Sequence, residues 1–178
     1  MVEDVLRSEA PKEESARRVY EAIVSPLSWA ARNEAISSIG PRGIEGWLRA
    51  MESPDWTHRR WAMQMQRHLH SPENIETILE SLKRALKDPN KKIRRSACDA
   101  VLALEVDDAR MRRELVPLVV PMLADPSRLV RRMAAFYLLR FADLVPLELA
   151  VDATSREPER TKRWQLVELV KRIAASQS

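Results

Sequence analysis

Cysteine and glycine are scarce in this 178-residue chain. The one cysteine, Cys98, excludes an internal disulfide framework and is typical of proteins from a reducing compartment. The three glycines all lie between positions 40 and 46, which leaves few places for the tight turns of a β-protein. No apolar run is as long as a membrane span or the core of a secretion signal. The sequence therefore predicts an all-α protein of the cytoplasm.

Residue types that commonly carry catalysis are also few. The only histidines are His58, His68 and His70, and no two have the four-residue spacing that puts a pair of zinc ligands on one helical face. The segment 40–46 has the pattern of a turn and a helix start, not of a phosphate-binding loop. Cys98 follows Ala97 on a predicted helix, which favours a buried thiol. We expect no enzyme activity and no catalytic, cofactor-binding or metal-binding residues.

One motif recurs along the chain. Its clearest copies, at 88–97 and 125–134, read Asp-Pro-Asn-Lys-Lys-Ile-Arg-Arg-Ser-Ala and Asp-Pro-Ser-Arg-Leu-Val-Arg-Arg-Met-Ala. Counted from the prolines at 54, 89, 126 and 158, the fifth residue is always arginine and the eighth is alanine or leucine; a weaker copy follows Pro26. The units of a repeat array bury their apolar residues only against their neighbours, so the array forms an extended surface that favours binding over catalysis. The residues at these two positions are Arg59, Arg94, Arg131 and Arg163, and Ala62, Ala97, Ala134 and Leu166.

Hydrophobic periodicity and the prolines predict the helices. Asp88 and Asp125 precede prolines, so we expect each to cap a helix whose first turn holds the proline. Pro117 and Pro121 lie inside an apolar segment, which predicts a kinked or split helix there. The expected helices are 12–24, 28–39, 41–52, 54–70, 72–87, 89–105, 108–124, 126–142, 145–156 and 158–175.

The motif resembles the HEAT repeat: Asp-Pro, then a branched apolar residue, two arginines, alanine and leucine. The spacing of 28 to 37 residues is closer to the short repeats of phycobilisome lyase-type proteins. The resemblance implies an α-solenoid of about five HEAT-like helical hairpins in a single domain, 1–178. Within it we expect N-terminal cap helices at 1–25, repeats at 26–157 and a C-terminal capping helix at 158–178. The resemblance also implies a structural ladder in which an arginine of each unit bonds to the adjoining unit, formed by Arg59, Arg94, Arg131 and Arg163.

Positive charge collects in the second half of the sequence. Residues 1–82 hold ten Lys and Arg against thirteen Asp and Glu, and residues 83–178 hold twenty against thirteen. Three of these cations come two residues after a proline that starts a predicted helix, where the helix dipole disfavours positive charge. We expect them to lie along one basic edge that holds phosphate or an acidic segment of a protein partner, with surface salt bridges as the alternative. We define the basic edge as Lys91, Lys92, Arg128 and Arg160.

The predicted function is that of a non-catalytic scaffold or adaptor that binds another protein. In the resemblance, the second helix of each hairpin lines a concave face, and charged residues there are candidates for partner contact. Trp164 stands where other copies have a second arginine, which favours a closing residue at the end of the array, with a partner-binding aromatic as the alternative. The concave-face candidates are Arg42, Glu45, Arg49, Glu76, Glu80, Lys83, Arg84 and Arg113.

Three alternatives stay open at this point. The net charge and five tryptophans are compatible with nucleic-acid binding. Alkylpurine DNA glycosylases resemble HEAT solenoids and place Trp and a carboxylate near the lesion. Here the only Trp followed four residues later by a carboxylate is Trp164, with Glu168. The short repeat class also includes phycobilin lyases, although no residue marks a bilin site. We expect no membrane contact, and the sequence leaves the oligomeric state open.

Overall fold

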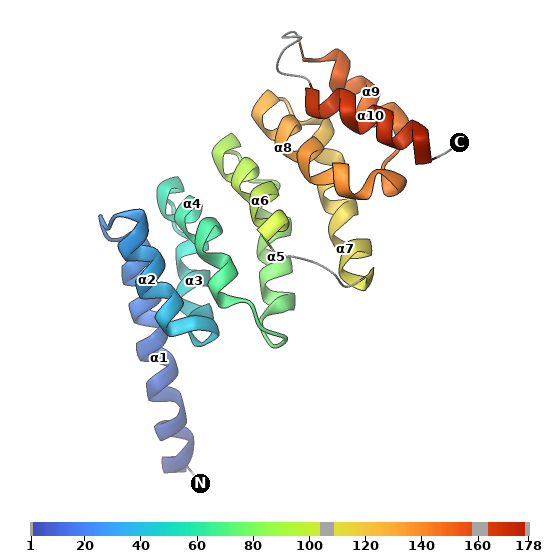
Figure 1. Ribbon diagram of the computed structural model, residues 1–178. Coiled ribbons are helices and arrows are strands. Elements are labelled where there is room, and N and C mark those ends of the chain that lie inside the picture. The colour runs from blue at the N-terminus through green and yellow to red at the C-terminus, as the bar shows by residue number, and fades with distance from the viewer. Residues whose placement is uncertain (1, 104–108, 158–163, 177–178) are drawn as a thin grey trace. The chain divides into compact units, whose positions relative to one another are not determined.

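Helices make up every regular element that the computed structural model describes. It describes residues 2–103, 109–157 and 164–176, and the side chains of 11–101, 114–157 and 164–176. The chain divides into two compact units, Met1–Arg84 and Ala85–Ser178, and each is treated by itself. That the two form a single domain of about five hairpins stays a prediction. Within the described residues, the all-α class is confirmed (Figure 1).

The first unit is built on the long helix α1 (Val2–Val24), against which α2 (Trp29–Ile39) and α3 (Ile44–Met51) pack. Gly46 brings α3 against the backbone of α1, since a Cβ at this position would lie 1.8 Å from the carbonyl oxygen of Ala16. Trp47 is fully buried, and its Nε1 donates to the carbonyl of Ala62 on α4 (Trp56–Met65) at 2.7 Å. The 3-10 turns η1 (Gly40–Gly43) and η2 (Gln66–Leu69) contact each other, and α5 (Ile75–Ala85) follows.

The second unit places three helices in succession. Helix α6 (Lys91–Ala103) packs on α8 (Arg128–Leu138), and α8 packs on α10 (Trp164–Ser176). Between them in sequence come α7 (Ala109–Val119) with the 3-10 turn η3 (Val120–Ala124), then the 3-10 turn η4 (Leu139–Leu144) and α9 (Leu147–Ser155). The residues eight positions after the repeat prolines are all fully buried, one in the first unit and three in the second: Ala62, and Ala97, Ala134 and Leu166.

Prolines shape one helix as expected. The segment predicted as a kinked or split helix changes from α-helix to 3-10 helix at Val119, with Pro117 inside α7 and Pro121 in the first positions of η3. Two further changes to 3-10 helix, after α4 and after α8, were not anticipated, because no proline marks them. In the second, Phe141 has φ −135° and ψ 36°, so the helix is interrupted at a residue that is itself buried.

The predicted helix caps are wrong in position. Helices α6 and α8 begin at Lys91 and Arg128, two residues after the repeat proline, instead of at the proline. The carboxylates of Asp88 and Asp125 instead accept the backbone N–H groups of Asn90 and Ser127, each at 2.7 Å. Each Asp-Pro pair therefore builds a short turn that leads into the helix, and the cap position passes to the residue after the proline.

Candidate binding surface

Three of the predicted ladder arginines make the same local contacts. In each, Nη1 donates to the two backbone carbonyls that lie five and six residues earlier, at 2.8 to 3.1 Å. These carbonyls belong to the turn that precedes each helix, so the guanidinium ties the turn to its own helix. Sequence reasoning anticipated bonds to the adjoining unit and missed this bond within the unit. The three residues are Arg59, Arg94 and Arg131, and Arg163 lies outside the described residues.

Within the second unit, two of these arginines also reach the next motif copy. Arg94 binds the carboxylate of Asp125 with both Nε and Nη2, at 2.6 and 3.1 Å, and the two side chains are only 14% and 3% exposed. This carboxylate raises the pKa of Arg94, an effect that burial partly opposes. Arg131 donates to the carbonyl of Arg156 at 3.2 Å. The arginine at the same motif position therefore bonds to the next copy in both cases, through a carboxylate from α6 to α8 and through a backbone carbonyl from α8 toward α10.

A basic hollow opens between the first turns of α6 and α8. It has a volume of about 720 Å³ and is lined by Lys91, Arg94 and Arg128 together with Leu129 and the prolines, Asn90 and Ser127 of the two lead-in turns. Because Asp125 neutralises Arg94, the remaining positive charge comes from Lys91 and Arg128. The structure thus brings two residues of the basic edge together; Lys92 is exposed beside them, and Arg160 lies outside the described residues.

The charge at this hollow opposes helix stability. Lys91 and Arg128 are the first residues of their helices, where the positive end of the dipole disfavours a cation. Within the described part of the chain, Lys91 has no hydrogen bond or ion pair that would offset this cost. Ser127 makes no side-chain bond to cap α8, while the side-chain oxygen of Asn90 accepts the N–H of Lys92 at 2.9 Å. The arrangement therefore suits a negatively charged partner group.

Several of the concave-face candidates pair with neighbours on their own surface. Arg49 binds Glu13 of α1 at 3.0 Å, and Arg84 lies 3.6 Å from Glu52. Lys83 pairs with Glu80, another candidate, one turn away on α5. Of the other candidates, Arg42 on η1, Glu45 on α3 and Glu76 on α5 are exposed, and the side chain of Arg113 lies outside the described residues.

The groups weighed for catalysis lie in ordinary structural settings. Burial raises the pKa of the Cys98 thiol to about 12. Desolvation lowers the pKa of His68, whose Nε2 lies 2.8 Å from Oδ1 of Asn33. Glu168, the carboxylate four residues after Trp164, accepts a hydrogen bond from Arg172 at 3.1 Å and so forms a surface ion pair. Across the described residues, no three His, Cys, Asp or Glu side chains are grouped as metal ligands.

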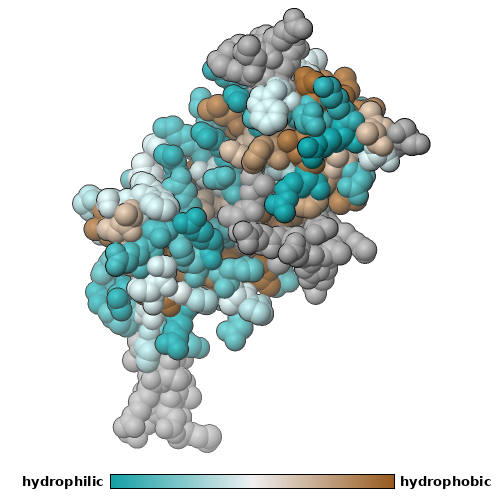
Figure 2. Space-filling model, in the orientation of Figure 1, coloured by the Kyte–Doolittle hydropathy of each residue, from teal (hydrophilic) through white to brown (hydrophobic). Residues whose placement is uncertain are grey.

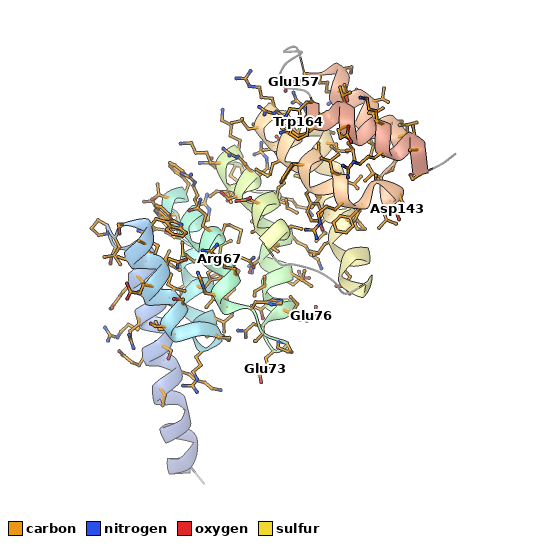
Figure 3. All side chains as sticks on the ribbon, in the orientation of Figure 1. Arg67, Glu73, Glu76, Asp143, Glu157 and Trp164 are labelled. Atoms are coloured by element: carbon orange, nitrogen blue, oxygen red, sulfur yellow. The ribbon has the colours of Figure 1, made fainter. Side chains whose placement is uncertain are left out.

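Two exposed apolar residues of α8 were missed by the sequence reading. Leu129 and Phe136 are 42% and 47% exposed and lie seven residues apart, so they share one side of the helix. Trp164, at the start of α10, is 54% exposed (Figure 3). Arg32, in the weaker copy that follows Pro26, is 2% exposed. Its Nε donates to the carbonyl of Ala22, and its guanidinium lies 4.0 Å from the centre of the Trp61 ring.

Comparison with known families bears on these surfaces. A model of the family described as Cnd1, non-SMC mitotic condensation complex subunit 1, matches residues 61–154, which is more than half of the chain. The chain belongs to the Cnd1 family. Cnd1 is a HEAT-repeat-type helical family, which supports the HEAT resemblance but not the phycobilisome lyase-type variety. The matched range includes both sides of the basic hollow. No curated protein compared with the chain matches it.

The structure also bears on the membrane prediction. None of the described helices combines the length and the apolar composition that a bilayer crossing requires.

Proposed function

We propose that the chain is a cytosolic, non-catalytic scaffold that binds an acidic segment of a partner protein through the basic edge. The family name describes its members as subunits of a condensation complex, which supports a role within an assembly. The observation that carries the proposal is the hollow between α6 and α8, where Lys91 and Arg128 occupy the first position of two neighbouring helices. The concave-face candidates are proposed to contribute further contacts.

The energetic argument is that these cations cost stability where they stand. A cation in the first turn destabilises its helix by about 0.3 to 1 kcal/mol. The first turn of α5 instead contains an acidic residue, Glu76, whose charge the helix dipole favours. A carboxylate-rich partner offsets the cost by pairing with both cations and with the helix N-termini together.

The test compares capture of the protein's cellular partner by the intact chain and by the Lys91→Glu/Lys92→Glu/Arg128→Glu variant. A matched control, Lys12→Glu/Arg18→Glu, reverses two exposed charges on α1. We expect the edge variant to lose the partner and the control to retain it. Because the edge substitutions place negative charge at helix starts, the melting temperature should stay the same or rise, so unfolding would not explain a loss. Equal capture by wild type and edge variant would refute the proposal.

Nucleic-acid binding is the second candidate. The second unit holds eighteen Lys and Arg against thirteen Asp and Glu, and Trp164 is exposed on it. This alternative predicts duplex binding at about 50 mM salt that weakens steeply as salt is added, because phosphate contacts release counterions. A titration that shows no duplex binding at low salt would remove it.

A further inference from the structure

The outward side of α8 departs from the repeat pattern. Three residues after the repeat prolines the sequence has Thr57, Lys92, Leu129 and Thr161, and ten residues after them it has Gln64, Asp99, Phe136 and Glu168. Among these four copies, both positions are polar except in the one that forms α8. Leu129 and Phe136 therefore place apolar side chains where this architecture otherwise faces water, and both are about half exposed.

Cations accompany this apolar pair. Arg132 lies between Leu129 and Phe136 on the same side of α8. Arg140 comes four residues after Phe136, at the start of η4. The Nε of Arg132 is buried and has no hydrogen-bond partner among the described residues. Arg140 is exposed, and no carboxylate of the described residues pairs with it. The stripe thus alternates apolar and positively charged groups.

The neighbouring helices extend the same surface. Arg95 on α6 and Trp164 on α10 occupy the motif position that Arg132 occupies on α8, six residues after the proline. Both helices contact α8, and Arg94 and Arg131, which share one motif position, each bond to the next copy. Figure 2 shows hydrophobic and hydrophilic side chains interleaved over the part of the visible face that α8 and α10 occupy. We define the α8 face as Leu129, Arg132, Phe136 and Arg140, flanked by Arg95 and Trp164.

We propose that the α8 face docks an acidic amphipathic helix of a partner protein. This inference rests on the proposed scaffold function and names the chemistry of the partner. An apolar pair seven residues apart matches the spacing of anchors on a docked helix, and the surrounding arginines are complementary to carboxylates on its flanks. Nucleic acid fits less well, because Leu129 offers no aromatic ring on which a base could stack.

A peptide probe tests the proposal on the intact chain. The probe is a dye-labelled 18-residue helix-forming peptide with leucines along one face and glutamates along the other, and its control has the same composition with the two residue types mixed around the helix. Binding is measured by fluorescence anisotropy. The Leu129→Ser/Phe136→Ser variant is compared with Leu144→Ser/Val151→Ser, which replaces two equally exposed apolar residues elsewhere in the second unit.

We expect the amphipathic peptide to bind at least tenfold more tightly than its mixed isomer. The Leu129→Ser/Phe136→Ser variant should lose at least tenfold in affinity, while the Leu144→Ser/Val151→Ser control stays within twofold of wild type. Equal binding of the two peptides, or no effect of Leu129→Ser/Phe136→Ser, would overturn the inference. Displacement of the peptide by an equimolar 20-base-pair duplex would overturn it in favour of nucleic acid.

The outcome is separable from that of the proposed function. If the Leu129→Ser/Phe136→Ser variant still captures the cellular partner and the edge variant does not, the scaffold function stands and the α8 face is not the docking site. If neither variant changes capture, both proposals fail.

Discussion

The Arg94–Asp125 pair provides the sharpest test of how the second unit is held together. The two side chains are 14% and 3% exposed and share two hydrogen bonds, so removal of either one leaves a largely buried charge without its partner. Loss of one member of such a pair costs about 3 kcal/mol of unfolding free energy. Asp125→Asn is the most conservative change, because the amide oxygen still accepts the N–H of Ser127.

The assay is urea unfolding followed by circular dichroism at 222 nm on wild type, Asp125→Asn, Arg94→Met and the double variant. We expect each single variant to lose about 3 kcal/mol, and the double variant to lose about 4 instead of about 6, because it contains no uncompensated charge. The control is Asp99→Asn, an exposed carboxylate on α6, which should change stability by less than about 0.5 kcal/mol. Additive single effects, or a loss under about 1 kcal/mol for Asp125→Asn, would refute this account of the pair.

Three further changes test the remaining structure. Trp47→Phe leaves the carbonyl of Ala62 without its indole donor in the core and should cost about 2 kcal/mol in urea unfolding; an unchanged midpoint would contradict that bond. Gly46→Ala should cost at least about 3 kcal/mol of unfolding free energy, because the new Cβ meets a backbone carbonyl of α1. Gly40→Ala, at φ 64° with open space around it, should cost only about 1 kcal/mol. The reverse order would be inconsistent with the packing of α3 on α1. The thiol of Cys98 has a pKa of about 12 in the folded chain against 9.0 unperturbed, so the unfolded chain loses that proton first and stability should fall as pH rises above 9. Cys98→Ala should reduce this loss of stability at high pH. If the wild-type thiol reacts with Ellman's reagent at pH 8 as fast in the folded chain as in the chain unfolded by urea, Cys98 is not buried and the prediction is wrong.

Much of the fold could be predicted because the repeat motif fixes both helix positions and burial. The alanines at the eighth position are buried as expected, since their small side chains admit the neighbouring helix. The caps were misplaced because the sequence pattern Asp-Pro suits both a helix cap and a turn that leads into a helix. Only the observed bonds of Asp88 and Asp125 to the N–H groups two residues later distinguish the two.

The candidate surface was predictable in part. The recurrence of Lys91 and Arg128 two residues after a proline indicated the basic edge, but not that these residues begin their helices and line one hollow. Leu129 and Phe136 were not predicted as surface residues, although the sequence contains a signal: the same two positions are polar in the copies that follow Pro54, Pro89 and Pro158. The exposure of Leu129 and Phe136 depends on which side of α8 its neighbouring helices cover, and the structure shows this.

Amide hydrogen exchange of the intact chain, alone and with its captured partner, tests the central claim most directly. The proposed binding surface predicts slower exchange in the first turn of α6, along α8 and at the start of η4 as far as Arg140 when the partner is bound. Protection confined to the first unit, or exchange that is unchanged throughout the second, would contradict it.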